Sequence, residues 1–405
     1  MSATRLELDD GQRALLAGQA GGWVQRLMRL LVRLGEIYGA RRLLPVASVQ
    51  VSGVSYKSLG EPGLAFLEEL SQSGARVRAL TSLNPSGVDP ERAAELGFPA
   101  DFVERQARIM AAFARLGVLG SATCTPYQAG LLPRFGQHLA WAESSSVAFA
   151  NAVLGARTNR EGGPSALAAA VCGCTPEHGL HLDQARRPTH RVRVEAELGS
   201  TADHGALGVW VGRRVGAGVP YFEALGAAGP GADELKALGA AMAASGAVAM
   251  YHVAGVTPEA ARHDPAGLPE LRVGRAELDQ VYAELGPGDG AGEPDLLVTG
   301  CPHASLEEIA ALSGRLAGKR LRRPLWVCTS AFVREAARRL GLAGPLEAAG
   351  GRLVADTCPV VAPIERMGFR CTGVDSGKAA CYLPGLCQQR VVFRPLEELL
   401  EEALA

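Results

Sequence analysis

Apolar and polar residues change their spacing several times along this chain, and each change predicts a new helix or strand. In the first half, helix-like spacing predicts helices at residues 12–34, 63–73, 90–97 and 101–116. Short β-like runs between them predict strands at residues 41–51, 75–83 and 118–124. Because strands and helices alternate, this half is expected to form parallel strands flanked by helices.

The second half returns to this alternation after a less regular middle. Apolar runs predict buried strands at residues 205–215 and 247–256, and the Gly-, Pro- and charge-rich segment 265–293 is expected to be a surface excursion or a domain seam. From residue 294 onward, strands are expected at residues 295–299, 325–329 and 352–355, and helices at 306–316, 331–340 and 396–404. The chain therefore predicts an α/β fold with several subdomains, divided as residues 1–200, 201–293 and 294–405.

Residues 122–170 contain an unusual density of polar side chains among apolar ones. Glu143 stands beside three serines that begin at Ser144, and a charged run from Arg157 to Arg160 follows before two glycines. Glycine and proline can place such groups at helix ends, where free backbone N–H groups meet an anion. The alternative for this cluster is a solvated helix end held by salt bridges.

Polar loops follow three of the expected strands in the first half. The first contains Gly53, Val54 and Ser55, the second contains Asn84 and Pro85, and the third reads Cys-Thr-Pro-Tyr. Ligands of parallel α/β sheets bind at the carboxyl ends of strands. These loops are therefore candidates for a binding site, although an isolated Gly-Val-Ser turn is also an ordinary strand-to-helix connection.

Composition and charge indicate which kinds of binding partner the protein is expected to have. The 405 residues carry a net charge of −1, which favours neither nucleic acid nor an anionic membrane. The chain has 9 cysteines and no apolar signal segment at its start, so reduced thiols in the cytoplasm are expected rather than a disulfide framework. Neither a phosphate-binding Walker loop, nor a G-x-G-x-x-G fingerprint, nor a G-x-S-x-G elbow is present.

Three cysteines share one setting, because each follows an expected strand and lies in a polar loop that contains proline. They are Cys124, Cys301 and Cys358. Their wide separation in sequence excludes a local zinc knuckle, so the fold would have to bring them together. Three thiolates without a fourth local ligand suit an iron–sulfur cluster with one open iron, although buried structural cysteines are common. The other six are interpreted as core or surface thiols: Cys172, Cys174, Cys328, Cys371, Cys381 and Cys387.

Long blocks of sequence carry a family likeness: GEIYGARRLLPVASVQVSGVSYKSLG, TSLNPSGVD, TCTPYQAGLLPRFGQHLAWAESS, ANAVLGARTNREGGPSALAAA, GLHLD, TGCPHAS, DTCPVV and DSGKAACYLPG. Together they resemble the large subunit of the aconitase X family over nearly the whole chain, and most of all its archaeal branch. Two positions depart from that pattern. Ala122 stands where relatives often have cysteine, and Asp375 stands where they often have asparagine.

The resemblance implies an aconitase-like fold around a central [4Fe-4S] cluster bound by the three cysteines named above. It also implies a hydro-lyase that removes water from (R)-5-phosphomevalonate to give trans-anhydromevalonate 5-phosphate, a step of archaeal isoprenoid synthesis by a mevalonate route. The cluster's open iron would bind the departing hydroxyl.

The same resemblance assigns residue roles. The substrate-lining residues it implies are Gly53, Val54, Ser55, Asn84 and Pro85. Glu143 and Ser144 would hydrogen-bond near the reacting centre, and Glu143 is a candidate proton donor to the leaving hydroxyl. Lys378 would pair with an anionic group of the substrate. Arg157 and Arg160 would either bind phosphate or form supporting salt bridges.

The base that removes the substrate proton is expected on a small swivelling domain that this sequence does not contain. A separate small subunit, which supplies a serine and forms a heterodimer, is therefore implied. Two alternatives stay open: a dehydratase of cis-3-hydroxyproline or another small hydroxy acid, and a non-enzymatic iron–sulfur regulator.

Overall fold

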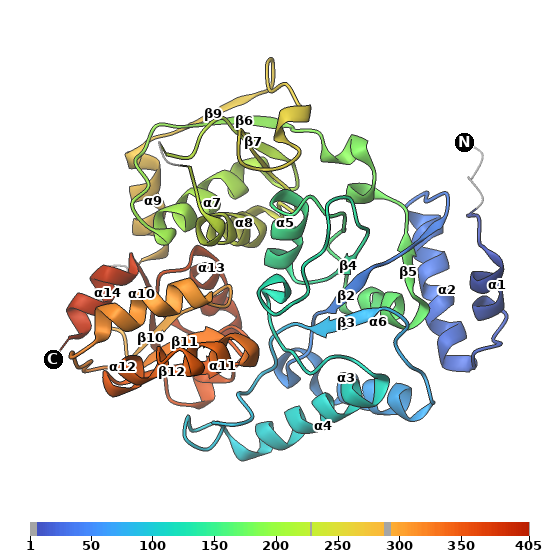
Figure 1. The fold of residues 1–405 in the computed structure, drawn as a ribbon, viewed down its shortest axis with the longest axis horizontal. Coiled ribbons are helices and arrows are strands. Elements are labelled where there is room, and N and C mark those ends of the chain that lie inside the picture. Colours follow the sequence, from blue (N-terminus) through green and yellow to red (C-terminus); the bar gives the residue numbers. More distant parts are fainter. Residues whose placement is uncertain (1–5, 227–228, 287–292, 405) are drawn as a thin grey trace.

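Three parallel sheets with flanking helices surround the centre of this computed structural model, which describes residues 6–226, 229–286 and 293–404 (Figure 1). The expected α/β fold with parallel sheets is therefore confirmed. Helices α5 (Ser144–Ala152) and α13 (Gly377–Cys387) lie near the middle, where the three groups of elements meet (Figure 1).

The first sheet has three parallel strands in the order β3-β2-β4. They are β2 (Ser48–Val51), β3 (Leu80–Leu83) and β4 (Ala140–Trp141). The surrounding helices are α1 (Asp10–Leu16), α2 (Gly22–Ile37), α3 (Tyr56–Gln72), α4 (Ala100–Leu116) and α6 (Gly163–Cys172). A short antiparallel pair joins β1 (Leu43–Pro45) to β5 (Cys174–Pro176). One apolar core, which includes Met28, Val49 and Ile109, unites these elements.

Three expectations in this region need correction. The helix expected at 12–34 is two helices, because the chain turns at Gly18 and Gly21, whose φ angles are 87° and 98°. Residues 90–97 form turns, because the Asp89 carboxylate accepts the backbone N–H groups that follow it. Residues 118–124 run beside β3 without forming a strand, and their one bridge joins Ala122 to β3.

The second sheet has four parallel strands in the order β8-β7-β6-β9. They are β6 (His190–Val194), β7 (Pro220–Phe222), β8 (His252–Val253) and β9 (Glu270–Val273). Its helices are α7 (Thr201–Val215), α8 (Ala232–Gly246) and α9 (Arg275–Leu285).

Three predictions in this region need correction. The strand expected at 205–215 is helix α7, which is buried on nearly all sides, so its apolar residues show no helical stripe. Of the strand expected at 247–256, only the two residues of β8 are in a strand. Segment 265–293 is not a surface excursion, since it contains β9 and α9 with buried apolar side chains; residues 287–292 of this prediction lie outside the described residues.

The third sheet is fully parallel, in the order β12-β11-β10-β13-β14. Its strands are β10 (Leu296–Thr299), β11 (Leu325–Thr329), β12 (Gly351–Ala355), β13 (Cys371–Val374) and β14 (Arg390–Phe393). The helices besides α13 are α10 (Leu306–Leu316), α11 (Ala331–Arg339), α12 (Ala343–Ala348) and α14 (Leu396–Ala403). All six elements expected after residue 294 are confirmed, whereas α12, β13, α13 and β14 were not anticipated.

Five short 3₁₀ turns complete the described elements: Pro126–Gln128, Gly179–His181, Asp183–Arg186, Ala260–Arg262 and Ile364–Arg366. None of the helices in the described part of the chain combines the length and the apolar character needed to cross a membrane.

Candidate active site

The fold brings together the three cysteines that the sequence singled out. Cys301 follows β10, Cys358 follows β12, and Cys124 lies in the loop beside β3. Each is a buried free thiol that interacts electrostatically with the other two, so all three occupy one region. Burial raises the pKa of each thiol to about 12, and the nearby charge of Lys378 opposes this rise.

One histidine connects the three cysteine loops. The backbone N–H of His303 donates to Cys124 Sγ at 3.1 Å. Its ring nitrogens bond the Thr123 hydroxyl at 2.9 Å and the Thr357 carbonyl at 3.0 Å, and these two threonines precede Cys124 and Cys358. Since His303 itself is two residues from Cys301, its hydrogen bonds reach all three loops.

Gln50 provides a second connection from β2. Its amide Nε2 donates to the Thr123 carbonyl at 2.8 Å, and its Oε1 accepts from the Ser146 hydroxyl at 2.5 Å. The side chain is fully buried, so both bonds are formed without competition from water. Gln50 therefore holds the Cys124 loop against the start of α5.

Glu143 and Lys378 form a buried ion pair beside the cysteines. Glu143 is the N-cap of α5, and its Oε1 accepts from Lys378 Nζ and from the hydroxyl of Ser144 at 3.3 Å. Lys378 lies in the first turn of α13 and also donates to Ser145 at 3.2 Å. Burial raises the pKa of Glu143, but the charge and hydrogen bond of Lys378 outweigh it and lower the pKa to about 2. Glu143 is therefore a carboxylate at neutral pH.

The first-half loops reach the same region. Gly53, with φ of 72°, leads into Ser55, which caps α3 and donates to the Val361 carbonyl at 2.8 Å in the segment after Cys358. Val54 is buried next to them.

The Asn84 side chain is buried, and its Oδ1 has no hydrogen-bond partner in the described residues. Pro85 is buried beside it. The same lack of a partner is found for the Tyr127 hydroxyl and for Thr357 Oγ1. Because an unsatisfied buried polar atom is costly, these groups are suited to meet a ligand or water.

The two candidate phosphate ligands differ in their contacts. Arg157 donates to the His181 carbonyl at 2.9 Å and forms an ion pair with Asp183. Arg160 is exposed, forms no hydrogen bond or ion pair with any described residue, and its charge lowers the pKa of Glu143. It lines a cavity of about 310 Å³ near the start of α6. The Arg157 side chain is thus occupied by bonds to the protein, whereas the Arg160 side chain, unpaired among the described residues, is free to bind a phosphate.

Asp375, the departure noted in the sequence, forms no hydrogen bond or ion pair with Lys378. It accepts from Thr299 Oγ1 at 2.8 Å, and burial raises its pKa to about 7.

The residues that sequence reasoning missed are the connecting ones. Gln50 lies in an ordinary apolar strand and gives no local signal. His303 lies two residues after Cys301 in the block TGCPHAS, which is a signal that could have identified it.

Within the described ranges, no three His, Cys, Asp or Glu side chains are close enough to hold a single metal ion. The three buried thiols share one region, and cysteine thiolates are the ligands that iron–sulfur clusters use. The chemistry of these donors therefore fits such a cluster.

This chain is similar to known proteins over nearly its whole length. Family models match in order along the chain: the aconitase X first domain over residues 5–184, the second over 188–283 and the third over 294–405. The phosphomevalonate dehydratase large subunit of Methanothermobacter thermautotrophicus is 51% identical over 391 residues, which are 96% of each chain. The cis-3-hydroxy-L-proline dehydratase of Pseudomonas aeruginosa is 38% identical over 415 residues, which span 98% of this chain and 70% of that protein. The crystal structure of Thermococcus kodakaraensis aconitase X in its holo-form matches with a TM-score of 0.91 and 41% identity, over 98% of this chain and 100% of that one.

Proposed function

This chain belongs to the aconitase X family, as its sequence predicted, and on that premise we propose that it is the large subunit of a hydro-lyase. The reaction is the dehydration of (R)-5-phosphomevalonate to trans-anhydromevalonate 5-phosphate, a step of isoprenoid synthesis. The observation that carries this choice is the 51% identity, over nearly the full length of both chains, to a phosphomevalonate dehydratase large subunit. The cis-3-hydroxy-L-proline dehydratase is more distant, at 38%.

The proposed cofactor is a [4Fe-4S] cluster on Cys124, Cys301 and Cys358. Support comes from three buried thiols in one region, held on loops that a single histidine connects. When bound, such a cluster supplies a Lewis acid for the departing hydroxyl through the iron that no cysteine binds. The positive charge of Lys378 favours the thiolate form of these ligands.

Glu143 is the proposed proton donor to the leaving hydroxyl. Because Glu143 is ionised beside Lys378, its carboxylate must take up a proton before it can donate one. Lys378 keeps its own proton, since the neighbouring carboxylate raises its pKa, and it holds the Glu143 carboxylate in place. Ser144 orients the same carboxylate through its hydroxyl.

The substrate is expected to contact two loops and one free cation. Gly53, Val54 and Ser55 form one loop, and Asn84 with Pro85 forms the other, where the unpartnered Asn84 Oδ1 offers an acceptor. Arg160 is the proposed phosphate ligand, because a guanidinium matches phosphate oxygens and this one has no described protein partner.

A small subunit completes the enzyme in this proposal. Two relatives, at 51% and 46% identity, are named as large subunits, which presupposes a second chain. That chain would supply the base, a serine on a swivelling domain, and would cover the site. A cytoplasmic location suits the reduced thiols of the cluster ligands.

An anaerobic assay of the two subunits with 5-phosphomevalonate and cis-3-hydroxy-L-proline offered separately tests this function, with Cys301→Ser as the control. Turnover of the phosphate substrate alone, absent without the small subunit and lost in Cys301→Ser, is expected. Turnover of hydroxyproline alone would replace the substrate and keep the mechanism. No turnover by a complex that contains its cluster would favour a non-enzymatic role.

A further inference from the structure

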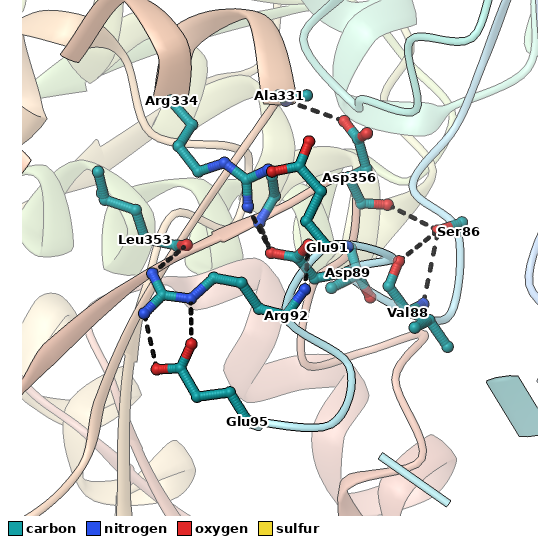
Figure 2. Close-up of polar contacts among 12 residues, drawn as sticks. Ser86, Val88, Asp89, Glu91, Arg92, Glu95, Ala331, Arg334, Leu353 and Asp356 are labelled. Carbon is teal, nitrogen blue, oxygen red and sulfur yellow. Dashed lines mark hydrogen bonds and ion pairs between the residues drawn. The ribbon is translucent and has the colours of Figure 1, made fainter. Parts of the chain in front are cut away.

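The loop 84–98 follows β3 of the first sheet, and its residues lie beside Leu353 of β12 and Asp356, which follows β12 (Figure 2). Its centre is Asp89, which is fully buried. A buried carboxylate is energetically costly unless ion pairs and hydrogen bonds satisfy it. The partners of Asp89 therefore show which segments of the chain it holds together.

Asp89 connects its loop to the third sheet through one carboxylate oxygen. Oδ2 accepts from Arg334 of α11 at 2.7 Å (Figure 2). It also accepts from the backbone N–H of Ala355, the last residue of β12, at 2.8 Å. Oδ1 accepts from the backbone N–H groups of Glu91 at 3.1 Å and Arg92 at 3.3 Å, in its own loop. The carboxylate therefore joins its loop to the last residue of β12.

The segment after Ala355 leads directly to Cys358, and the same loop contacts it again. Ser86 donates to the Asp356 carbonyl from its backbone N–H at 2.8 Å and from its hydroxyl at 3.0 Å (Figure 2). A parallel bridge pairs Ser86 with Thr357. Residues 355–357 are thus held by two residues of the loop, Ser86 and Asp89. Asn84 lies at the start of the same loop.

We propose that Asp89 is a positioning residue: by binding Arg334 and the Ala355 amide, it fixes Cys358 relative to Asn84. This rests on the proposed function only in treating Cys358 as a cluster ligand and Asn84 as a substrate contact. Asp89 should control the mobility of the Cys358 loop whether or not Cys358 binds a cluster and Asn84 contacts the substrate.

Glu91 provides a matched comparison. It binds the other end of the same guanidinium, Arg334, at 2.6 Å, but its side chain is 69% exposed and forms no hydrogen bond with residues 355–358. Removing the Glu91 charge alters the ion pair without releasing the Ala355 amide. A change that breaks the contacts of Asp89 should therefore reach Cys358, whereas a change at Glu91 should not.

The test uses the full chain without metal and measures alkylation by iodoacetamide, resolved for each cysteine by peptide mass spectrometry. Asp89→Asn is expected to raise the labelling rate of Cys358 about tenfold over the unchanged protein, because its loop opens locally. Cys172 in α6, far from the loop, should change by less than about twofold, and Glu91→Gln should leave both cysteines unchanged. In the reconstituted complex, Asp89→Asn should also raise KM for 5-phosphomevalonate more than it lowers kcat.

Equal increases at Cys358 and Cys172 would mean that Asp89 acts only on global stability, and an unchanged Cys358 rate would mean that it positions nothing; either result overturns the proposal. If Asp89→Asn does not fold, Arg334→Met replaces it, with the same selective labelling expected because this change removes the cation that binds Asp89. Since the labelling needs neither cluster nor substrate, a failed dehydration assay would reject the proposed function without deciding this one.

Discussion

Lys378 and Glu143 are 235 residues apart in the chain, yet they form a buried ion pair where α13 and α5 begin. Their side chains are only 8% and 12% exposed. Each helix therefore starts with a charged side chain that depends on the other helix for its partner. The pair joins the helices that follow the first sheet and precede the last strand of the third sheet. It therefore contributes both to the stability of the fold and to the candidate active site.

Replacing one member of this pair is expected to cost more than replacing both. Lys378→Met leaves a buried carboxylate without its cation, which should lower the free energy of unfolding by ~3–5 kcal/mol. Glu143→Gln combined with Lys378→Met removes both charges and should recover most of that loss. Urea unfolding of the single and double variants measures this coupling, and strictly additive effects would contradict it. Dehydration should be lost in all three variants.

His303 is expected to control how well the chain retains its cluster. His303→Phe fills the space but removes both ring hydrogen bonds to the neighbouring cysteine loops, each worth ~1 kcal/mol. After anaerobic reconstitution, the iron and sulfide content per chain should fall and the cluster absorbance should decay faster. His252→Phe, at a buried histidine in the second sheet, is the control for general damage. Equal loss in both variants would rule out a specific role for His303.

The sequence predicted the parts of the site that local patterns reveal. The third sheet alternates regularly, so the spacing of its apolar residues was enough to place its cysteine loops at strand ends. Helix α7 was mistaken for a strand, because a helix buried on all sides has no polar face to mark its period.

What local patterns did not reveal were the partners across the fold. Glu143 and Lys378 were both identified, but not their pairing, because contacts between distant segments leave no spacing in the sequence. The same reason explains why Gln50 and Asp89 were missed. Each looks like an ordinary polar residue until its burial is known.

Gly163 is expected to be required where α6 approaches the Gly53 loop. A Cβ atom at Gly163 would lie 2.8 Å from the Ser52 carbonyl oxygen, a backbone atom that cannot easily move. Gly163→Ala should therefore lower the free energy of unfolding by ~1–3 kcal/mol and raise KM, because the helix must shift away from the loop. At the neighbouring Gly162 the nearest atom would be 3.7 Å away, so Gly162→Ala should change stability by less than ~0.5 kcal/mol. Similar effects at both glycines would exclude this explanation.

Acid is expected to destabilise the protein through buried neutral histidines. Burial, reinforced by His138, lowers the pKa of His181 to about 3, and burial lowers that of His252 to about 4. Since the unfolded chain binds these protons near pH 6.5, it gains them first as the pH falls. Each ring should then reduce the free energy of unfolding by ~1.4 kcal/mol per pH unit below pH 6.5, until its folded-state pKa is reached. Urea unfolding at pH 7 and pH 5 measures the slope, and His181→Asn should make it shallower.

Substitution of Arg160 is expected to weaken substrate binding, whereas substitution of Arg157 is expected to lower stability. Arg160→Gln removes a cation with no described protein partner, so stability should be unchanged while KM for 5-phosphomevalonate rises about ten- to hundredfold, the value of a lost charge-assisted hydrogen bond. Arg157→Gln removes the ion pair to Asp183 and the hydrogen bond to the His181 carbonyl, and should lower the free energy of unfolding by ~1–2 kcal/mol without changing KM. Steady-state kinetics of the reconstituted complex, together with thermal unfolding, distinguish the two variants. A rise in KM for Arg157→Gln but not for Arg160→Gln would assign the phosphate to Arg157 instead.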